Sequence, residues 1–334
     1  FTSQGNQRLT KYCDEKNIKL NKCGKLVVAQ NESELPWLDE LMRRANKNGV
    51  PLQSITEEES RSIEPRVKTY KRALFSPTTS SVNPKELVDS LLSDAIHEGI
   101  KIIPNSRYLG RNGKRSIQTS NETFEAKYII NVAGLYADKI GRDFGFSKDY
   151  RILPFKGLYL YSNEAPGDLK THIYPVPDLA NPFLGVHFTV TTDGKIKLGP
   201  TAIPAFWREQ YKGLSNFNLI ELAEILFRQA GLFLSSSFDF KALAFRELQK
   251  YSKSKLVSLG SSLASGVNVK NYQKWGQAGI RAQLLNIRKK TLEMDFVLEG
   301  DDQSMHILNT VSPGFTCALP FAEHVCNKIK DQLG

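Results

Sequence analysis

The clearest alternation of apolar and polar positions lies near the middle of the chain. Residues 183–190 are almost entirely apolar, β-branched or aromatic, and residues 195–200 alternate between polar and apolar side chains. Asp193 and Gly194 lie between the two segments, and an Asp-Gly pair in this position is typical of a β-hairpin turn. The pattern predicts two antiparallel strands. His187 is a polar ring inside the apolar strand, so it is a candidate site residue, with a hydrogen-bonded core histidine as the alternative.

A second informative pattern is the junction between an apolar strand and a helix. Residues 128–132 are largely apolar, and they run directly into Ala133-Gly134 and a helical pattern that continues to about Phe144. Small residues between a strand and a helix N-terminus let a phosphate or a ring approach the backbone closely. Many α/β units have such a turn, so it indicates a nucleotide-binding sheet only together with its surroundings.

The remaining periodicity predicts two kinds of arrangement of helices and strands. Helix-and-strand units occur at 83–145 and 295–334, whereas antiparallel strands with helices occur at 20–82 and 150–275. This alternation predicts a mixed α/β and α+β fold of two interleaved domains. The predicted helices are 1–17, 33–48, a short one from Thr56, 85–98, 216–235, 239–250 and 315–333. The predicted strands are 25–29, 73–82, 100–103, 115–119, 123–126, 151–161, 276–283, 296–298 and 306–309.

Composition and charge exclude some classes of protein. The chain has 334 residues, of which 40% are hydrophobic and 24% charged, as is typical of a globular protein. It has no run of 18 apolar residues that would indicate a membrane span. The net charge of +10 is spread along the chain. We interpret it as a lysine-rich surface, with attraction to anionic substrates or to an anionic membrane surface as the alternative.

Nucleic acid and metal are not expected as partners. No nucleic-acid-binding module accompanies the charge. The four cysteines show no CxxC pair and no Cys/His spacing of a metal site. They are predicted to be reduced thiols of a cytoplasmic protein.

Eight short segments, taken together, resemble the FAD-dependent D-amino-acid-oxidase-like superfamily, and within it the L-2-hydroxyglutarate dehydrogenase (oxidase) family. The segments follow one another in the same order as in that family, and they extend across nearly the whole chain. The stretches 173–178 and 182–189 are the most specific, and the others indicate mainly the superfamily. The segments are 23–29, 133–138, 152–157, 173–178, 182–189, 198–200, 278–283 and 312–314.

The sequence departs from the family pattern in several places. It contains no GxGxxG turn for the FAD pyrophosphate, so the resemblance implies that the opening βαβ unit is missing and that the chain is truncated. Lys156 replaces the usual arginine, which keeps the charge but loses bidentate reach. Thr201 replaces the usual asparagine after Gly199-Pro200. The stretch 251–275 matches poorly.

The resemblance implies two interleaved domains. An incomplete, Rossmann-like FAD-binding domain would consist of residues 1–20, 83–148 and 276–334. An antiparallel-sheet substrate-binding domain would consist of residues 21–82 and 149–275.

The resemblance also implies a reaction, in which L-2-hydroxyglutarate is oxidised to 2-oxoglutarate by hydride transfer to flavin N5. The protein must then orient the acid and take the hydroxyl proton. We predict Arg281 as the carboxylate clamp, because a guanidinium makes two parallel bonds to a carboxylate. His187 is the predicted base. Lys156, Tyr174 and Thr201 are predicted to bind the substrate.

Eight residues are predicted to contact the cofactor. The start of the last helix would favour the negative charge of a reduced flavin, although a Ser-Pro helix start is also common for structural reasons. Asp138 has helix capping as its alternative role. The predicted cofactor residues are Ala133, Gly134, Leu135, Asp138, Gly279, Ser312, Pro313 and Gly314.

Two other functions remain open at this point. One is an amine-side oxidase of the same superfamily, related to glycine or sarcosine oxidases, and the other is a non-catalytic fragment without flavin. The electron acceptor is a quinone or dioxygen. The predicted location is the cytoplasm, with the inner face of the membrane as the alternative.

Overall fold

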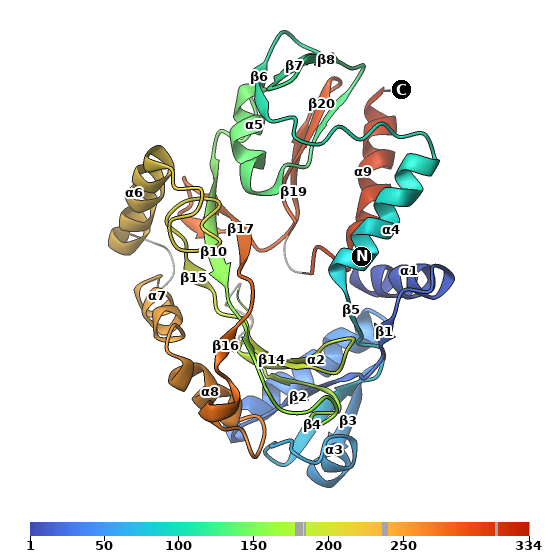
Figure 1. Ribbon diagram of the computed structural model, residues 1–334, viewed down its shortest axis with the longest axis vertical. Helices are drawn as coiled ribbons and strands as arrows, with labels where there is room; N and C mark the ends of the chain where they lie inside the picture. Colours follow the sequence, from blue (N-terminus) through green and yellow to red (C-terminus); the bar gives the residue numbers. More distant parts are fainter. Residues whose placement is uncertain (178–182, 184, 236–239, 311–312, 334) are drawn as a thin grey trace.

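Two β-sheets form the middle and the lower part of the molecule as drawn in Figure 1, and helices from distant parts of the sequence lie against them. The structure is a computed structural model, and it describes residues 1–177, 183, 185–235, 240–310 and 313–333. The mixed α/β character predicted from the sequence is confirmed. The division into two interleaved domains stays a prediction.

The larger sheet has eight strands. Its face with Leu26, Ile173 and Phe188 packs against Leu256 and Val257 of helix α8 (Lys253–Ser261). Its other face packs in part against α2 (Leu35–Lys47). The strands, in spatial order, are β16 (Lys274–Trp275), β11 (Leu160–Tyr161), β14 (Ile196–Gly199), β13 (His187–Val190), β12 (His172–Pro175), β2 (Lys25–Val28), β4 (Arg72–Ser76) and β3 (Gln53–Thr56).

The hairpin predicted from the alternating pattern is confirmed. Strands β13 and β14 pair antiparallel from His187 opposite Gly199 to Val190 opposite Ile196. Gly194 in the turn has a φ of +78°, a backbone conformation that glycine adopts without steric cost. Local turn chemistry therefore sets the register of these two strands.

The second sheet shares a two-stranded ribbon with the first. Its strands are, in order, β15 (Ile203–Pro204), β10 (Tyr150–Gly157), β17 (Gly279–Asn286) and β18 (Thr291–Leu292). Strands β10 and β17 pair along their whole length, the Gly276 amide then donates to the Tyr159 carbonyl at 2.8 Å, and β11 pairs with β16 in the larger sheet. The segment predicted as one strand, 151–161, is thus divided between two sheets. Gly276 is required at the crossing, because a Cβ there would lie 2.5 Å from the Tyr161 ring.

A third group of elements lies at the top of Figure 1. It contains the sheet β19 (Val297–Gly300), β20 (Ser304–Asn309) and β9 (Ile129–Asn131), in which β20 and β9 are parallel. Helix α9 (Ala318–Leu333) packs on it through Phe321 and Val325. The chain passes from β9 through the short helix η2 (Gly134–Tyr136) into α5 (Ala137–Asp143), as the strand–helix junction predicted.

Two predictions of secondary structure need correction. Residues 101–103 have no regular structure, and Ile100 and Ile102 on either side of Lys101 are exposed, so the strand predicted at 100–103 is wrong. Helix α9 begins at Ala318 rather than at residue 315, because hydrogen-bonded turns occupy 313–317. Ser312 lies outside the described residues.

The remaining elements complete the covering layers. Within the described chain, no helix combines the length and the apolar character that crossing a bilayer demands. These elements are α1 (Thr2–Glu15), β1 (Leu20–Asn21), η1 (Glu32–Glu34), α3 (Glu57–Ile63), β5 (Ser81–Val82), α4 (Pro84–His97), β6 (Tyr108–Arg111), β7 (Ser116–Thr119), β8 (Thr123–Glu125), α6 (Leu219–Ser235), α7 (Phe240–Gln249) and η3 (Val269–Asn271).

Candidate active site

A cavity of about 810 Å³ lies where the ribbon passes from one sheet to the other. Its walls come from β10 and β17 on one side, β11 and β14 on the other, and the segment that follows β20. No Asp or Glu is among its described lining residues. The aromatic and polar lining residues are Phe155, Tyr159, Tyr161, Phe183, Phe315, Lys197, Thr201, Gln277, Arg281, Asn309 and Thr310.

Arg281 lines this cavity, where the sequence predicted a carboxylate clamp. It lies on β17 opposite Phe155 of β10, and its guanidinium carbon is 5.2 Å from the centre of the Phe183 ring. The Phe155 and Phe183 rings are 4.6 Å apart. Burial lowers the pKa of Arg281, but an arginine stays charged at neutral pH. Arg281 therefore places a positive charge beside an aromatic wall of the cavity, an arrangement that suits an anionic ligand.

Thr201 also lines the cavity, but its hydroxyl already has protein partners. It donates to the Lys156 carbonyl at 2.9 Å and accepts from the Leu158 amide at 3.0 Å. Because a hydroxyl has one proton to donate, this one cannot also donate to a substrate carboxylate. These bonds fix the backbone at the end of β10, and the substrate contact of Thr201 stays a prediction.

His187 lies behind the cavity wall and is not among its described lining residues. It is 3% exposed, Nδ1 lies 2.8 Å from the Gly185 carbonyl, and its ring stacks on Tyr174 at 3.7 Å. The ring of Tyr159, which does line the cavity, is 6.5 Å away. Burial lowers the pKa of His187 to about 3, so the ring is neutral at physiological pH. This placement does not support the predicted role of His187 as the base, which stays a prediction.

Tyr174 and Lys156 are likewise outside the described lining of the cavity. Tyr174 packs beside His187 and under the Lys25 ammonium, which is 5.2 Å from its ring. Burial raises the pKa of Tyr174 to about 12. Lys156 follows Phe155 on β10 and therefore points to the opposite face of the strand. The structure does not bring these two residues together with Arg281.

Lys197 is a lining residue that the sequence analysis did not select. It lies on β14 between the buried Ile196 and Leu198, and its ammonium is 4.6 Å from the centre of the Tyr159 ring. Burial lowers the pKa of Lys197. The alternation along residues 195–200 placed Lys197 opposite the apolar face, but it did not reveal that a cavity lies on that side.

A second cavity of about 500 Å³ adjoins the first. Ala282, Thr310 and Gly314 line both cavities, and Gly134 lines the second. Gly134 has a φ of +51°. Two predicted cofactor residues, Gly134 and Gly314, thus both border this second cavity.

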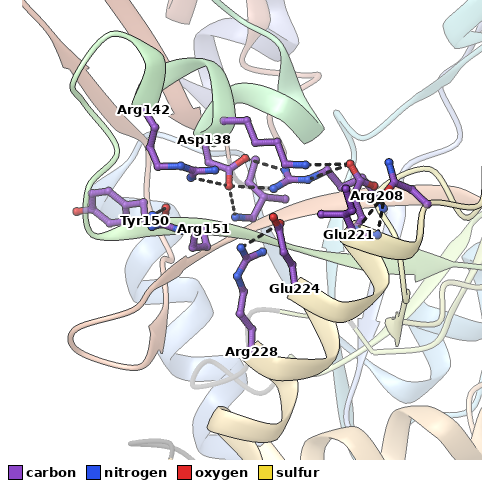
Figure 2. Close-up of polar contacts among 12 residues, drawn as sticks. Asp138, Arg142, Tyr150, Arg151, Arg208, Glu221, Glu224 and Arg228 are labelled. Carbon is purple, nitrogen blue, oxygen red and sulfur yellow. Dashed lines mark hydrogen bonds and ion pairs between the residues drawn. The ribbon is translucent and has the colours of Figure 1, made fainter.

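Asp138, in contrast, is buried in an ion network (Figure 2). Its oxygens accept two bonds from Arg208 at 2.7 and 3.0 Å, one from Arg142 at 3.2 Å and one from the Ile152 amide at 3.1 Å. Burial alone would raise the pKa of Asp138, but the hydrogen bonds and charge of Arg208 hold it below its usual value. The predicted cofactor contact is therefore corrected to a structural role.

The other predicted cofactor residues have mixed positions. Gly279 lines the first cavity, and a Cβ built there would meet no atom within 4 Å. Ala133 is exposed next to Gly134. Leu135 packs inward near Ile152, and its carbonyl accepts a bond from Arg208. Pro313 is exposed, outside the described lining of both cavities.

Comparison with known proteins identifies the class. A family model described as "FAD dependent oxidoreductase" matches residues 1–326. The chain belongs to this family, as the resemblance predicted, and FAD is its cofactor.

Within the family, the chain is similar to L-2-hydroxyglutarate dehydrogenases. It is 32% identical over 366 residues to the mitochondrial enzyme of Homo sapiens, covering 99% of this chain and 75% of that one. It is 34% identical over 334 residues to the enzyme of Indibacter alkaliphilus, covering 97% and 81%. Among solved structures, L-alpha-glycerophosphate oxidase from Mycoplasma pneumoniae shares the fold with a TM-score of 0.70 at 20% identity, covering 94% and 74%.

The two adjoining cavities fit the ring end of FAD. Their described lining combines glycine backbone with aromatic and aliphatic walls, and it contains two cations and no carboxylate. Such a lining suits a flat ring that becomes more negative on reduction. Gly134, Gly279, Ala282 and Gly314 would border the cofactor there.

Proposed function

We propose that the chain oxidises L-2-hydroxyglutarate to 2-oxoglutarate, with FAD as the immediate electron acceptor. The similarity to proteins named L-2-hydroxyglutarate dehydrogenase supports this choice of substrate. The structural observation that supports it most is the pair of cations, Arg281 and Lys197, in a cavity whose described lining contains no carboxylate. A small dicarboxylate complements such a cavity in charge.

The residues of the chain would bind and orient the acid. The reaction removes a hydride from C2 and a proton from the hydroxyl, and bound FAD supplies the two-electron acceptor. Arg281 binds the carboxylate next to C2 through two parallel bonds, which fixes the position of C2. The wall of Phe155 and Phe183 excludes water from this contact and so strengthens it.

The group that takes the hydroxyl proton stays unassigned. His187 remains a prediction as the base, and its position behind Tyr159 does not support that role. We therefore base the proposal on substrate binding rather than on proton transfer.

Anaerobic reduction of the bound flavin tests the substrate. We expect L-2-hydroxyglutarate to bleach the flavin and to yield one 2-oxoglutarate per flavin, and the D enantiomer, glycine and sarcosine to react far more slowly. Faster reduction by glycine or sarcosine would instead identify an amine-side oxidase. A purified chain without flavin would favour a non-catalytic fragment.

We also propose a peripheral contact with an anionic membrane, where a quinone would accept the electrons. The outer face of α6 supports it, because Ile220, Phe227 and Leu234 recur every seven residues and are 71%, 82% and 82% exposed. An exposed apolar stripe on a basic protein is typical of a helix that lies on a lipid surface. Reoxidation of the reduced flavin by a quinone analogue or by dioxygen distinguishes the two acceptors.

A further inference from the structure

Lys197 is half-buried, and the described residues provide no counter-ion for its ammonium. Within the described residues, no carboxylate lies within ion-pairing distance of its ammonium, which rests on the Tyr159 ring. Lys195, two residues earlier, is 59% exposed and pairs with Asp193 at 2.5 Å. Removing an ammonium from water is costly unless another group compensates. A ligand anion in the cavity would supply that compensation.

The neighbours of Lys197 in the sheet do not neutralise it. Thr189 is its partner on β13, and Tyr161 is its partner on β11. His172 on β12 and Lys25 on β2 are paired in the same region of the sheet. Burial, together with the charges of Lys25 and Lys197, lowers the pKa of His172 to about 4, so this ring is neutral. The described part of this sheet face is therefore cationic.

Lys197 and Arg281 approach one cavity from different sheets. Arg281 is opposite Phe155 on the ribbon, and Lys197 is opposite Tyr161, six residues further along the same chain segment. Six extended residues would span about 20 Å, and the change of sheet at 158–159 makes this an upper limit for the distance between the two backbone positions. Both side chains line the same cavity of about 810 Å³.

We propose that Lys197 binds the second carboxylate of a dicarboxylate whose 2-hydroxy carboxylate is held by Arg281. Lys197 would thus set the preference for dicarboxylic over monocarboxylic 2-hydroxy acids. The inference rests on the proposed function, and it replaces Lys156, which points away from the cavity, as the second carboxylate ligand.

Binding of two unreactive probes tests this role. Calorimetry on the flavin-containing protein compares glutarate with pentanoate, which has the same length and lacks one carboxylate. We expect the wild type to bind glutarate about 10- to 100-fold more tightly, the range of one charged hydrogen bond in a partly buried site. Lys197→Met should abolish the difference, and Lys197→Arg should retain part of it.

Lys195→Met is the matched control, because it removes an exposed lysine of the same hairpin. It should keep the preference for glutarate. If Lys197→Met unfolds, as judged by thermal melting, Lys197→Gln replaces it. A Lys197 variant that folds and still prefers glutarate by the wild-type factor would overturn the inference, and so would a wild type that binds both probes equally.

Turnover separates this inference from the proposed function. Suppose that the wild type oxidises L-2-hydroxyglutarate, and that the Lys197→Met variant still prefers L-2-hydroxyglutarate to L-2-hydroxypentanoate as strongly as the wild type does. Lys197 then has no such role, and the proposed function stands. If the wild type oxidises neither acid but its preference for glutarate depends on Lys197, the anion site stands and the proposed substrate is wrong.

Discussion

Asp138 and Arg208 show how strongly a single buried charge depends on its partner. Their side chains are 0% and 1% exposed, and they are 70 residues apart in the sequence. Nothing in the local pattern around either residue indicates the other. The cofactor contact predicted for Asp138 rests on the family resemblance, with helix capping as the alternative. Arg281 lines a cavity, and its role as carboxylate clamp stays a prediction. The sequence does not single out Lys197, because only tertiary structure decides which polar strand positions border a cavity.

Removing Asp138 should destabilise the fold severely. Asp138→Asn leaves the buried Arg208 guanidinium with only the more distant Glu221, at 3.7 Å, as a counter-ion, so we expect a loss of about 3–5 kcal/mol in the free energy of unfolding. Urea denaturation followed by circular dichroism measures it. Asp193→Asn, which breaks an exposed pair with Lys195, should cost less than about 1 kcal/mol. Equal effects of the two variants would contradict the structural role of Asp138.

Replacing Arg281 should impair substrate use rather than folding. Arg281→Met removes both parallel bonds to the carboxylate, so we expect kcat/KM for L-2-hydroxyglutarate to fall by about 100-fold. The kcat/KM of Arg281→Lys should lie between those of the wild type and Arg281→Met, because an ammonium keeps the charge but does not make two parallel bonds. Arg288→Met is the control, since Arg288 is 78% exposed and pairs with Asp149. Stopped-flow flavin reduction gives the rates, and unchanged rates for Arg281→Met would remove this residue from the site.

At the scale of elements, the sequence predicts those structures that neighbouring residues determine, such as hairpins, and not those that depend on distant residues. The β13–β14 hairpin was predicted because its turn and its alternation lie within one stretch of sequence. The ribbon was not, because β10 meets β17 only after more than 100 residues, and the switch between sheets at 158–159 has no local signature. The strand predicted at 100–103 failed for the opposite reason, since a short apolar run is no strand without a partner.

Helix α6 carries the element-level prediction. A variant with Phe227→Asp and Leu234→Asp places charges on the exposed stripe, and it should lose binding to vesicles that contain anionic lipid. Flotation of the flavin-containing protein with vesicles of phosphatidylserine and phosphatidylcholine measures this. Flavin reduction by substrate should stay at the wild-type rate, because α6 contributes no residue to the described cavity lining. Equal flotation of variant and wild type would contradict the membrane contact.

At the scale of the whole molecule, buried histidines tie stability to pH. His172 and His187 are buried on the paired strands β12 and β13, His306 is buried on β20, and burial lowers their pKa values to about 4, 3 and 4. The unfolded chain, with histidine pKa values near 6.5, binds more protons than the folded one between these values and about 6.5. Stability therefore falls as the pH decreases through this window.

We expect each buried histidine to contribute up to about 1.4 kcal/mol per pH unit to this loss. Urea unfolding at pH 7 and pH 5 measures the slope. His187→Gln should give a shallower slope than the wild type, whereas His97→Gln, at an exposed position on α4, should not. An identical slope for His187→Gln would mean that His187 is not held neutral by burial.

The ribbon that belongs to both sheets has a consequence for substrate length. The segments β10–β11 and β16–β17 stay hydrogen-bonded to each other where they pass from one sheet to the other. One sheet therefore cannot tilt against the other without breaking hydrogen bonds between these two segments. The separation of Arg281 and Lys197 is therefore set by continuous backbone rather than by a hinge. We expect a dicarboxylate one carbon shorter or longer to lose one of its two ion pairs instead of drawing the walls together.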